Sequence, residues 1–287
     1  MFNFLQSYAK INIGLKITGQ RPDGYHTLQT IFQEISLYDT IALEPTDQNW
    51  QITCANNTVP INETNLCIKA YLELKSHFPS LGGIKIHIKK GIPAGAGLGG
   101  GSSNAAALLK GINKLYDLGL TDGELEGIGL SLGADVPFFI RGGTQFAKGI
   151  GEVLFPATLP EMNAILLVVP DIHISTKWAY GLAKNHLPKN LKGGNFAPIP
   201  GVDESGISFA SWDNARELFE NDFEPLIFQT YPEIGKIKEK LLEYGAQYTS
   251  LSGSGSTVFG IFKEEAQAHK VRTRFSSSLQ TYLTHPI

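Results

Sequence analysis

The spacing of apolar and polar residues changes near residue 100 and divides the chain into a strand-rich part and a part with more helices. Apolar and polar residues alternate over 11–17, 40–43 and 84–88, which predicts strands with one buried face. Beyond residue 104 the apolar residues recur at helical spacing and would form one face of a helix: Ala105, Leu108, Leu109, Ile112, Leu115 and Tyr116. We expect Ser102 or Ser103 to be the N-cap of this helix.

Later segments continue the mixture of strands and helices. The predicted elements are a helix from the Thr-x-x-Glu capping box at Thr121 to about Gly133, a strand over 164–169, and a helix from Pro232 to Tyr244 that Gly245 ends. Two prolines before the strand favour a domain boundary near residue 155. Residues 185–209 are rich in Gly, Pro, Asn and Ser and predict a long surface excursion or lid. The pattern therefore predicts an α+β fold of two domains.

Composition and charge narrow the possible classes of protein. The chain has 287 residues with 24 basic and 27 acidic side chains, and its formal net charge of −3 provides no basic field for nucleic acid. The cysteines, Cys54 and Cys67, lack C-x-x-C spacing, which favours a reduced compartment and no structural zinc. The N-terminus has no signal-peptide pattern, and no apolar run approaches the length of a membrane span. We expect a cytoplasmic monomer or homodimer that acts on a small molecule, with neither nucleic acid nor a membrane as partner.

The segment Gly91–Asn104, with the sequence GIPAGAGLGGGSSN, has the composition of a phosphate-binding loop. Glycine lets backbone N–H groups approach an anion, and the first turn of the following helix adds further N–H groups. A Walker A loop is excluded because no Gly-Lys-Ser/Thr ends the segment. The fingerprint G-x-G-x-x-G is present, but the alternating strand before it and Pro93 argue against a Rossmann oxidoreductase, which stays an alternative. A flexible linker is disfavoured because the segment joins a predicted strand to a predicted helix.

Residues 93–106 resemble the ATP-binding motif of the GHMP small-molecule kinases, which are named for galactokinase, homoserine kinase, mevalonate kinase and phosphomevalonate kinase. Ala9–Asn12 and Leu251–Phe259 match two further motifs of that family in the right order, although Tyr8 stands where the family usually has proline. The resemblance implies a two-domain α+β fold with the active site in the cleft between the domains. It divides the chain into an ATP-binding domain over 1–155 and a substrate-binding domain over 156–287, whose last residues can pack back on the first domain.

The resemblance also implies roles for individual residues. Asn65, Leu66 and Lys90 would lie near the adenine of ATP, and the phosphates would be held by Pro93, Ala94, Gly95, Ala96, Gly97, Leu98, Gly99, Gly100, Gly101, Ser102 and Ser103. Asp135 would be the base that activates the acceptor hydroxyl, and Lys10 would pair with it and keep it ionised. An ammonium group in the apolar run around Lys10 needs such a partner, because an unpaired buried charge is costly. Mg²⁺ is expected with ATP, and Ser102 and Ser103 are candidate ligands, neither of them preferred.

Residues 19–30, with Asp23-Gly24-Tyr25-His26 at their centre, resemble the signature of one branch of these kinases. That branch uses ATP to phosphorylate the 2-hydroxyl of a CDP-linked methylerythritol, in the non-mevalonate route to isoprenoid precursors. The implied substrate-binding residues are Asn12, Tyr25, His26, Tyr180, Gly253 and Ser254. A pyrimidine can stack on an aromatic ring, and Tyr180 would supply a second ring, with Trp178 as a nearby competitor. Another acceptor, such as mevalonate, homoserine or a sugar, and a non-catalytic binding protein on the same fold are the alternatives.

Overall fold

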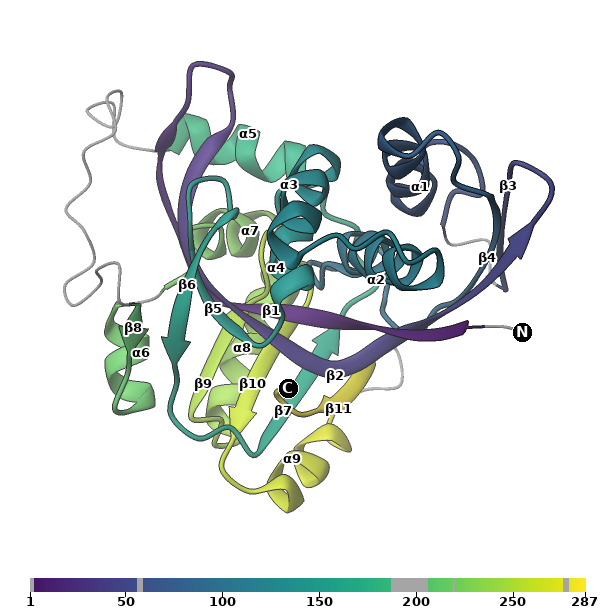
Figure 1. Cartoon of the computed structure of the whole chain (residues 1–287). Helices are drawn as coiled ribbons and strands as arrows, with labels where there is room; N and C mark the ends of the chain where they lie inside the picture. The colour runs from purple at the N-terminus through teal and green to yellow at the C-terminus, as the bar shows by residue number, and fades with distance from the viewer. Residues whose placement is uncertain (1–2, 56–58, 187–205, 219, 276–278) are drawn as a thin grey trace. The chain divides into compact units, whose positions relative to one another are not determined.

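The computed structural model describes residues 3–55, 59–186, 206–218, 220–275 and 279–287 (Figure 1). Packing divides the chain into two compact units. The first unit consists of Met1–Ala9, Leu37–Ala94 and Gly99–Gly142, and the second of Lys10–Ser36, Gly95–Leu98 and Gly143–Ile287. Both units are discontinuous along the chain, so a boundary near residue 155 stays a prediction. In the described residues, no helix combines the length and apolar character that a membrane span requires.

The sheet of the first unit is built from alternating strands. β3 (Trp50–Cys54) runs parallel to β4 (Gly83–Lys89), and β4 pairs antiparallel with the end of β2 (His26–Thr46), while β1 (Asn3–Gln20) also pairs with β2. The isoleucines of β4 are buried and its lysines and histidine are exposed. Strands cover all three predicted ranges, 11–17, 40–43 and 84–88, but only the strand over 84–88 shows the predicted alternation of buried and exposed residues. Over 11–17 every residue except Lys16 is buried.

Four helices complete the first unit: α1 (Leu66–His77), α2 (Gly100–Leu115), α3 (Asp122–Leu132) and α4 (Val136–Arg141). The predicted apolar face of α2 is confirmed, since Ala105, Leu108, Leu109 and Ile112 are fully buried. The predicted N-cap is wrong: Gly99 is the N-cap, in the left-handed conformation, and it offers no side chain to the helix. Ser102 and Ser103 fall instead in the first turn. The Thr121 capping box of α3 is present with both of its hydrogen bonds.

The second unit contains a four-stranded antiparallel sheet in the order β11 (Gln280–Thr284), β7 (Ala164–Val169), β10 (Val258–Phe262) and β9 (Tyr248–Leu251), drawn in teal and yellow-green in Figure 1. Four helices of the described residues contribute buried side chains to its core: α5 (Thr176–His186), α7 (Glu224–Thr230), α8 (Pro232–Glu243) and α9 (Glu265–Arg272). Every residue of β7 is buried, and α8 buries Ile234, Ile237 and Leu241. The predicted strand over 164–169 and the helix from Pro232 are confirmed.

The remaining strands of the second unit extend from the first half of β2. β2 pairs with β5 (Thr144–Lys148), followed by β6 (Val153–Thr158) and β8 (Ile207–Ser208). The last residues of the chain bind β2, where Ser36 N donates to His285 O at 2.8 Å and Ile287 N donates to Glu34 O at 3.1 Å. The helices α5 (Thr176–His186) and α6 (Trp212–Leu218) flank the predicted excursion at 185–209, most of which lies outside the described residues.

Candidate active site

The glycine-rich loop owes its path to three left-handed glycines. Gly95, Gly97 and Gly99 have φ angles of +67°, +82° and +71°, a region that side chains with a Cβ disfavour. The first backbone hydrogen bond within α2 runs from Ser103 N to Gly99 O at 2.9 Å. The N–H groups that precede it in a helix have no acceptor within the helix, and they carry a partial positive charge. The turn thus presents the N-terminus of a sixteen-residue helix, which suits a phosphate.

Asp39, which sequence reasoning missed, fixes the beginning of the loop. Its fully buried carboxylate accepts hydrogen bonds from Gly91 N and Ile92 N, both at 2.8 Å, and forms an ion pair with Lys90. The side chain of Lys90 is 6% exposed, so it is not the solvated end of a strand. An acidic residue directly before the strand over 40–43 was the available signal, but that position is also typical of a turn.

The residues expected near adenine lie beside the beginning of α2. A Cβ atom on Gly100 would stand 3.2 Å from Lys90 Nζ, and one on Gly101 would stand 3.6 Å from Leu66 Cδ1. Asn65 is the N-cap of α1: its Oδ1 accepts from Cys67 N at 2.9 Å. Burial raises the pKa of the Cys67 thiol to about 12, while Lys90 lowers it and Asp39 raises it. The first unit therefore groups Asn65, Leu66 and Lys90 around this helix N-terminus.

The two serines of the loop have different surroundings. Ser103 is buried, and its hydroxyl shares a 2.7 Å hydrogen bond with Ser7 Oγ, which also donates to Asn104 Oδ1. Ser102 is half-buried, and its Oγ lies 3.8 Å from the position of a Cβ on Gly133. Of the two candidates for a metal ligand, Ser102 fits the chemistry better, because the Ser103 hydroxyl already takes part in a buried hydrogen bond.

Asp135 follows Gly133 by two residues and is the N-cap residue of α4. Its φ and ψ angles are −83° and −12°, and its side chain accepts no capping hydrogen bond from the described helix. The residue is half-buried. Ser102 and Asp135 are thus held by neighbouring turns of the first unit.

In the second unit, Lys10 and Asn12 of β1 meet the middle of the glycine-rich loop. Lys10 is 4% exposed, and its ammonium group donates to Asn12 Oδ1 and, at 3.1 Å, to Gly97 O. It also lies 5.3 Å from the ring centroid of Phe32, a cation–π distance. Asn12 Nδ2 donates to Thr30 Oγ1 at 3.0 Å. The Lys10 ammonium is thus fixed in direction by neighbouring groups of its own unit.

The third motif, Leu251–Phe259, contacts the same residues of β1 and of the glycine-rich loop. Ser252 Oγ donates to Gly97 O at 2.9 Å and accepts from Asn12 N at 3.3 Å. Gly253 has a φ of +59°, and a Cβ there would stand 3.3 Å from Asn12 Oδ1 and 3.6 Å from Lys10 Nζ. Ser254 Oγ lies 3.3 Å from Thr176 Oγ1. The structure thus brings together Lys10, Asn12, Gly97 and Gly253, four of the predicted site residues.

The residues expected at a pyrimidine form an aromatic group in the second unit. The rings of His26 and Tyr180 stack at 5.0 Å with an interplanar angle of 22°, and Phe223 packs edge-on against Tyr180 at 4.9 Å. Trp178 instead packs against Tyr231, the residue between α7 and α8, so Tyr180 is the ring that meets His26. Tyr25 is 62% exposed at the tip of the β1–β2 turn. The stacked spacing leaves no room for a third ring between His26 and Tyr180, so a base would stack on an outer face.

Comparison with protein families agrees with this geometry. The model of the GHMP kinases N terminal domain matches residues 65–143, and the model of the GHMP kinases C terminal domain matches residues 208–280. The chain belongs to the GHMP kinase family, and the predicted α+β fold is confirmed. The first match begins at Asn65 and includes the glycine-rich loop and Asp135.

Individual relatives are similar over nearly their whole length. The chain is 39% identical to the 4-diphosphocytidyl-2-C-methyl-D-erythritol kinase of Prosthecochloris aestuarii and 42% identical to that of Chlorobium phaeobacteroides, each over 98% of this chain and 96% of the relative. A crystal structure of 4-(cytidine 5'-diphospho)-2C-methyl-D-erythritol kinase matches with a TM-score of 0.79 and 29% identity, covering 100% of this chain and 99% of the other. A homoserine kinase from Cytophaga hutchinsonii shares the fold, with a TM-score of 0.74 and 17% identity, covering 100% of this chain and 94% of its own.

We predict that Asp39→Asn lowers the free energy of unfolding by about 3–5 kcal/mol, because it leaves the Lys90 ammonium buried without its counter-charge. The double variant Asp39→Asn/Lys90→Met should recover a large part of this loss. Urea unfolding measures both. Glu44→Gln is the matched control, since Glu44 of β2 pairs with Lys85 of β4 and both side chains are partly exposed, where a pair contributes less than about 1 kcal/mol. Equal losses in the two single variants would contradict the prediction.

A second prediction concerns Gly97→Ala. A Cβ at residue 97 would lie 2.2 Å from the backbone oxygen of Ser252, and the φ angle of +82° adds strain. We expect a lower melting temperature and loss of the stabilisation that ATP gives, both measured by thermal unfolding with and without nucleotide. Gly127→Ala in α3, where no atom lies within 4 Å of the new Cβ, should retain the ATP effect. The steric argument fails if Gly97→Ala keeps it too.

Proposed function

We propose that this GHMP kinase transfers the γ-phosphoryl group of ATP to the 2-hydroxyl of 4-diphosphocytidyl-2-C-methyl-D-erythritol, a step of the non-mevalonate route to isoprenoid precursors. The observation that carries the choice of acceptor is the aromatic group of His26 and Tyr180, in the same unit as Lys10 and Asn12. A stacked pair beside an exposed tyrosine suits a flat base such as cytosine. The relatives are named as kinases of 4-diphosphocytidyl-2-C-methyl-D-erythritol, which supports this acceptor.

ATP binding is assigned to the glycine-rich loop and the beginning of α2. The left-handed glycines and the N–H groups of the first helical turn would hold the phosphates, while Leu66 and Lys90 would lie toward the base. Mg²⁺ would fit the Ser102 hydroxyl, since it prefers hard oxygen ligands and keeps several waters. When bound, it would neutralise charge on the phosphates.

The transfer forms a bond between the 2-oxygen of the acceptor and the γ-phosphorus, and it breaks the bond between that phosphorus and the β–γ bridging oxygen, so ADP leaves. Asp135 accepts the proton of the 2-hydroxyl. Lys10, aligned by Asn12 and Gly97, places its positive charge where negative charge develops. Asn12, Gly253 and Ser254 orient the acceptor. Action in the cytoplasm as a monomer or homodimer completes the proposal.

An acceptor panel tests the function. Purified protein with Mg²⁺ and ATP is incubated separately with the CDP-linked methylerythritol, mevalonate, homoserine and galactose. ADP release gives the rate, and phosphorus NMR identifies the phosphorylated product. We expect turnover with the CDP-linked substrate at least 100-fold above turnover with the other acceptors, because those acceptors have no cytosine ring to stack on His26 and Tyr180. No turnover with that substrate would refute the proposal, and preference for another acceptor would replace it.

A separate prediction tests the role of the Asp135 carboxylate. Asp135→Asn keeps the size of the side chain but cannot accept the proton, so we expect kcat to fall by about 10²–10⁴-fold. The KM for ATP should change little. Asp213→Asn, an exposed position on α6 whose carboxylate lies 3.7 Å from Arg216, is the matched control and should keep the wild-type kcat. A kcat for Asp135→Asn within threefold of wild type would rule out its role as the base.

A further inference from the structure

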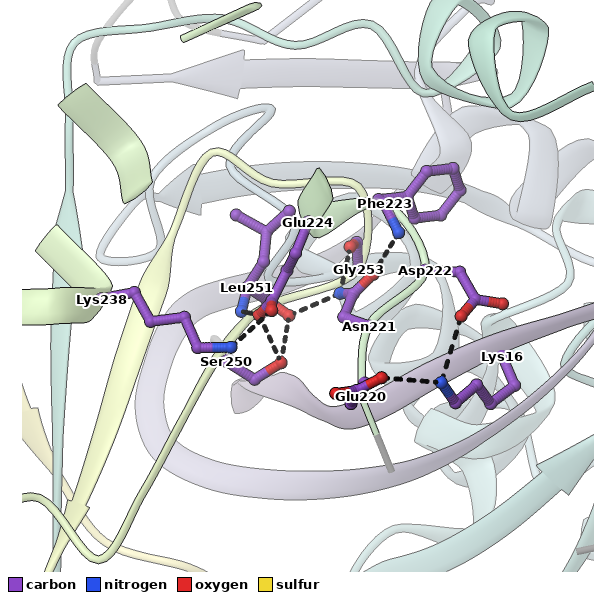
Figure 2. Close-up of polar contacts among 10 residues, drawn as sticks. All are labelled: Lys16, Glu220, Asn221, Asp222, Phe223, Glu224, Lys238, Ser250, Leu251 and Gly253. Carbon is purple, nitrogen blue, oxygen red and sulfur yellow. Dashed lines mark hydrogen bonds and ion pairs between the residues drawn. The ribbon is translucent and has the colours of Figure 1, made fainter. Parts of the chain in front are cut away.

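The segment Glu220–Glu224 links β1 to the third motif, Leu251–Phe259, and none of the assigned roles accounts for it (Figure 2). Its backbone is bound to β1: Leu15 N donates to Glu220 O at 3.1 Å, and Asp222 N donates to Leu15 O at 2.8 Å. The Asp222 carboxylate accepts from Ile17 N at 2.7 Å and from Lys16 Nζ at 3.2 Å. The segment is thus fixed to the strand that carries Lys10 and Asn12.

Asn221, which is 1% exposed, turns its side chain toward the loop and satisfies three backbone groups (Figure 2). Nδ2 donates to Leu251 O and to Gly253 O, both at 2.8 Å, and Oδ1 accepts from Phe223 N at 2.9 Å. The orientation of the amide follows from its partners, because two carbonyl oxygens need the NH₂ group and an N–H needs the oxygen.

A buried carboxylate holds the strand that leads into the same loop. Glu224 accepts from Leu251 N at 2.8 Å and from Ser250 Oγ at 3.1 Å, and it forms an ion pair with Lys238 of α8. Leu251 is therefore bound at both its N–H and its C=O by side chains of one short segment. Asn221 extends this hold by two residues, to Gly253.

The two carbonyls that Asn221 binds flank Ser252, the residue that connects the third loop to Gly97 and Asn12. The oxygen of the same amide binds the N–H of Phe223, whose ring supports Tyr180. The Asn221 side chain thus contacts the third motif, and through Phe223 it also supports the His26–Tyr180 pair proposed to bind the cytosine. It touches neither ligand, so any effect passes through these neighbours.

We propose that Asn221 is a positioning residue for phosphoryl transfer: its NH₂ group sets the place of Ser252 and Gly253, and its oxygen sets the place of Phe223 beneath Tyr180. The proposal rests on the proposed function. A misplacement of about 1 Å at a reacting group can cost about 100-fold in rate, so the NH₂ half of the amide controls kcat. The oxygen half controls binding of the base through Phe223.

Two variants separate the halves. Asn221→Asp has the same shape and keeps an acceptor for Phe223 N, but it sets a carboxylate oxygen against two carbonyl oxygens. We expect its kcat to fall about 10–100-fold, with the KM for the CDP-linked substrate within threefold of wild type. Asn221→Ala removes both halves, so its kcat should fall similarly and its KM for that substrate should rise at least fivefold.

The matched control is Asn163→Asp, which makes the same substitution where an exposed Asn163 Nδ2 donates to Lys263 O at 2.8 Å, away from the loop. It should keep the wild-type kcat and KM. Hydrogen exchange of the peptide over 248–257 gives a readout that needs no substrate. It should be faster in both Asn221 variants, while the peptide over 164–169 stays protected.

A merely structural role makes a different prediction. Val271→Ala, a buried position of α9 in the same core, supplies a variant that loses stability without touching the loop. If both Asn221 variants, assayed while fully folded, match Val271→Ala in kcat, KM and exchange over 248–257, the positioning role is overturned. If wild type does not phosphorylate the CDP-linked substrate, the proposed function fails, and unchanged exchange over 248–257 in the variants would still overturn the positioning of the loop.

Discussion

In the second unit, the carbonyl oxygen of Gly97 holds the predicted site residues of β1 and of the third motif in place. It accepts hydrogen bonds from the Lys10 ammonium at 3.1 Å and from the Ser252 hydroxyl at 2.9 Å. The Ser252 hydroxyl in turn accepts a hydrogen bond from Asn12 N. Three segments far apart in sequence are joined there. Only a residue without a Cβ can turn this carbonyl to both donors, because the backbone of Ser252 occupies the place of the side chain. The glycines of the loop are therefore needed for contacts within the protein as well as for an approach to phosphate.

The hydrogen bonds around this oxygen show how a buried ammonium is oriented before any substrate arrives. Lys10 is surrounded by the amide oxygen of Asn12, the carbonyl of Gly97 and the face of Phe32. Each interaction limits the directions in which the group can point. Such preorganisation is what phosphoryl transfer requires of a protein, since the reaction depends on position and charge more than on covalent chemistry.

The sequence predicted those parts of the fold that local pattern controls. The strand over 84–88, the face of α2 and the capping box at Thr121 each follow from spacing within a few residues. Asp39 and Asn221 could not be predicted, because each acts on backbone groups that only the folded chain brings near. The N-cap of α2 was misplaced for a related reason: a serine is the usual capping residue, whereas here the path of the loop requires a left-handed glycine at that position.

The buried thiol of Cys67 has a consequence for the chemistry of the folded protein in oxidising conditions. With its pKa raised to about 12, almost none of the group is present as the thiolate that reacts with peroxides and disulfides. Cys54 is only partly buried, so of the two thiols it is the more accessible to an oxidant. Oxidised Cys67 would therefore mark molecules whose first unit has already opened. Such a modification would report that a molecule had opened earlier, even after it had refolded.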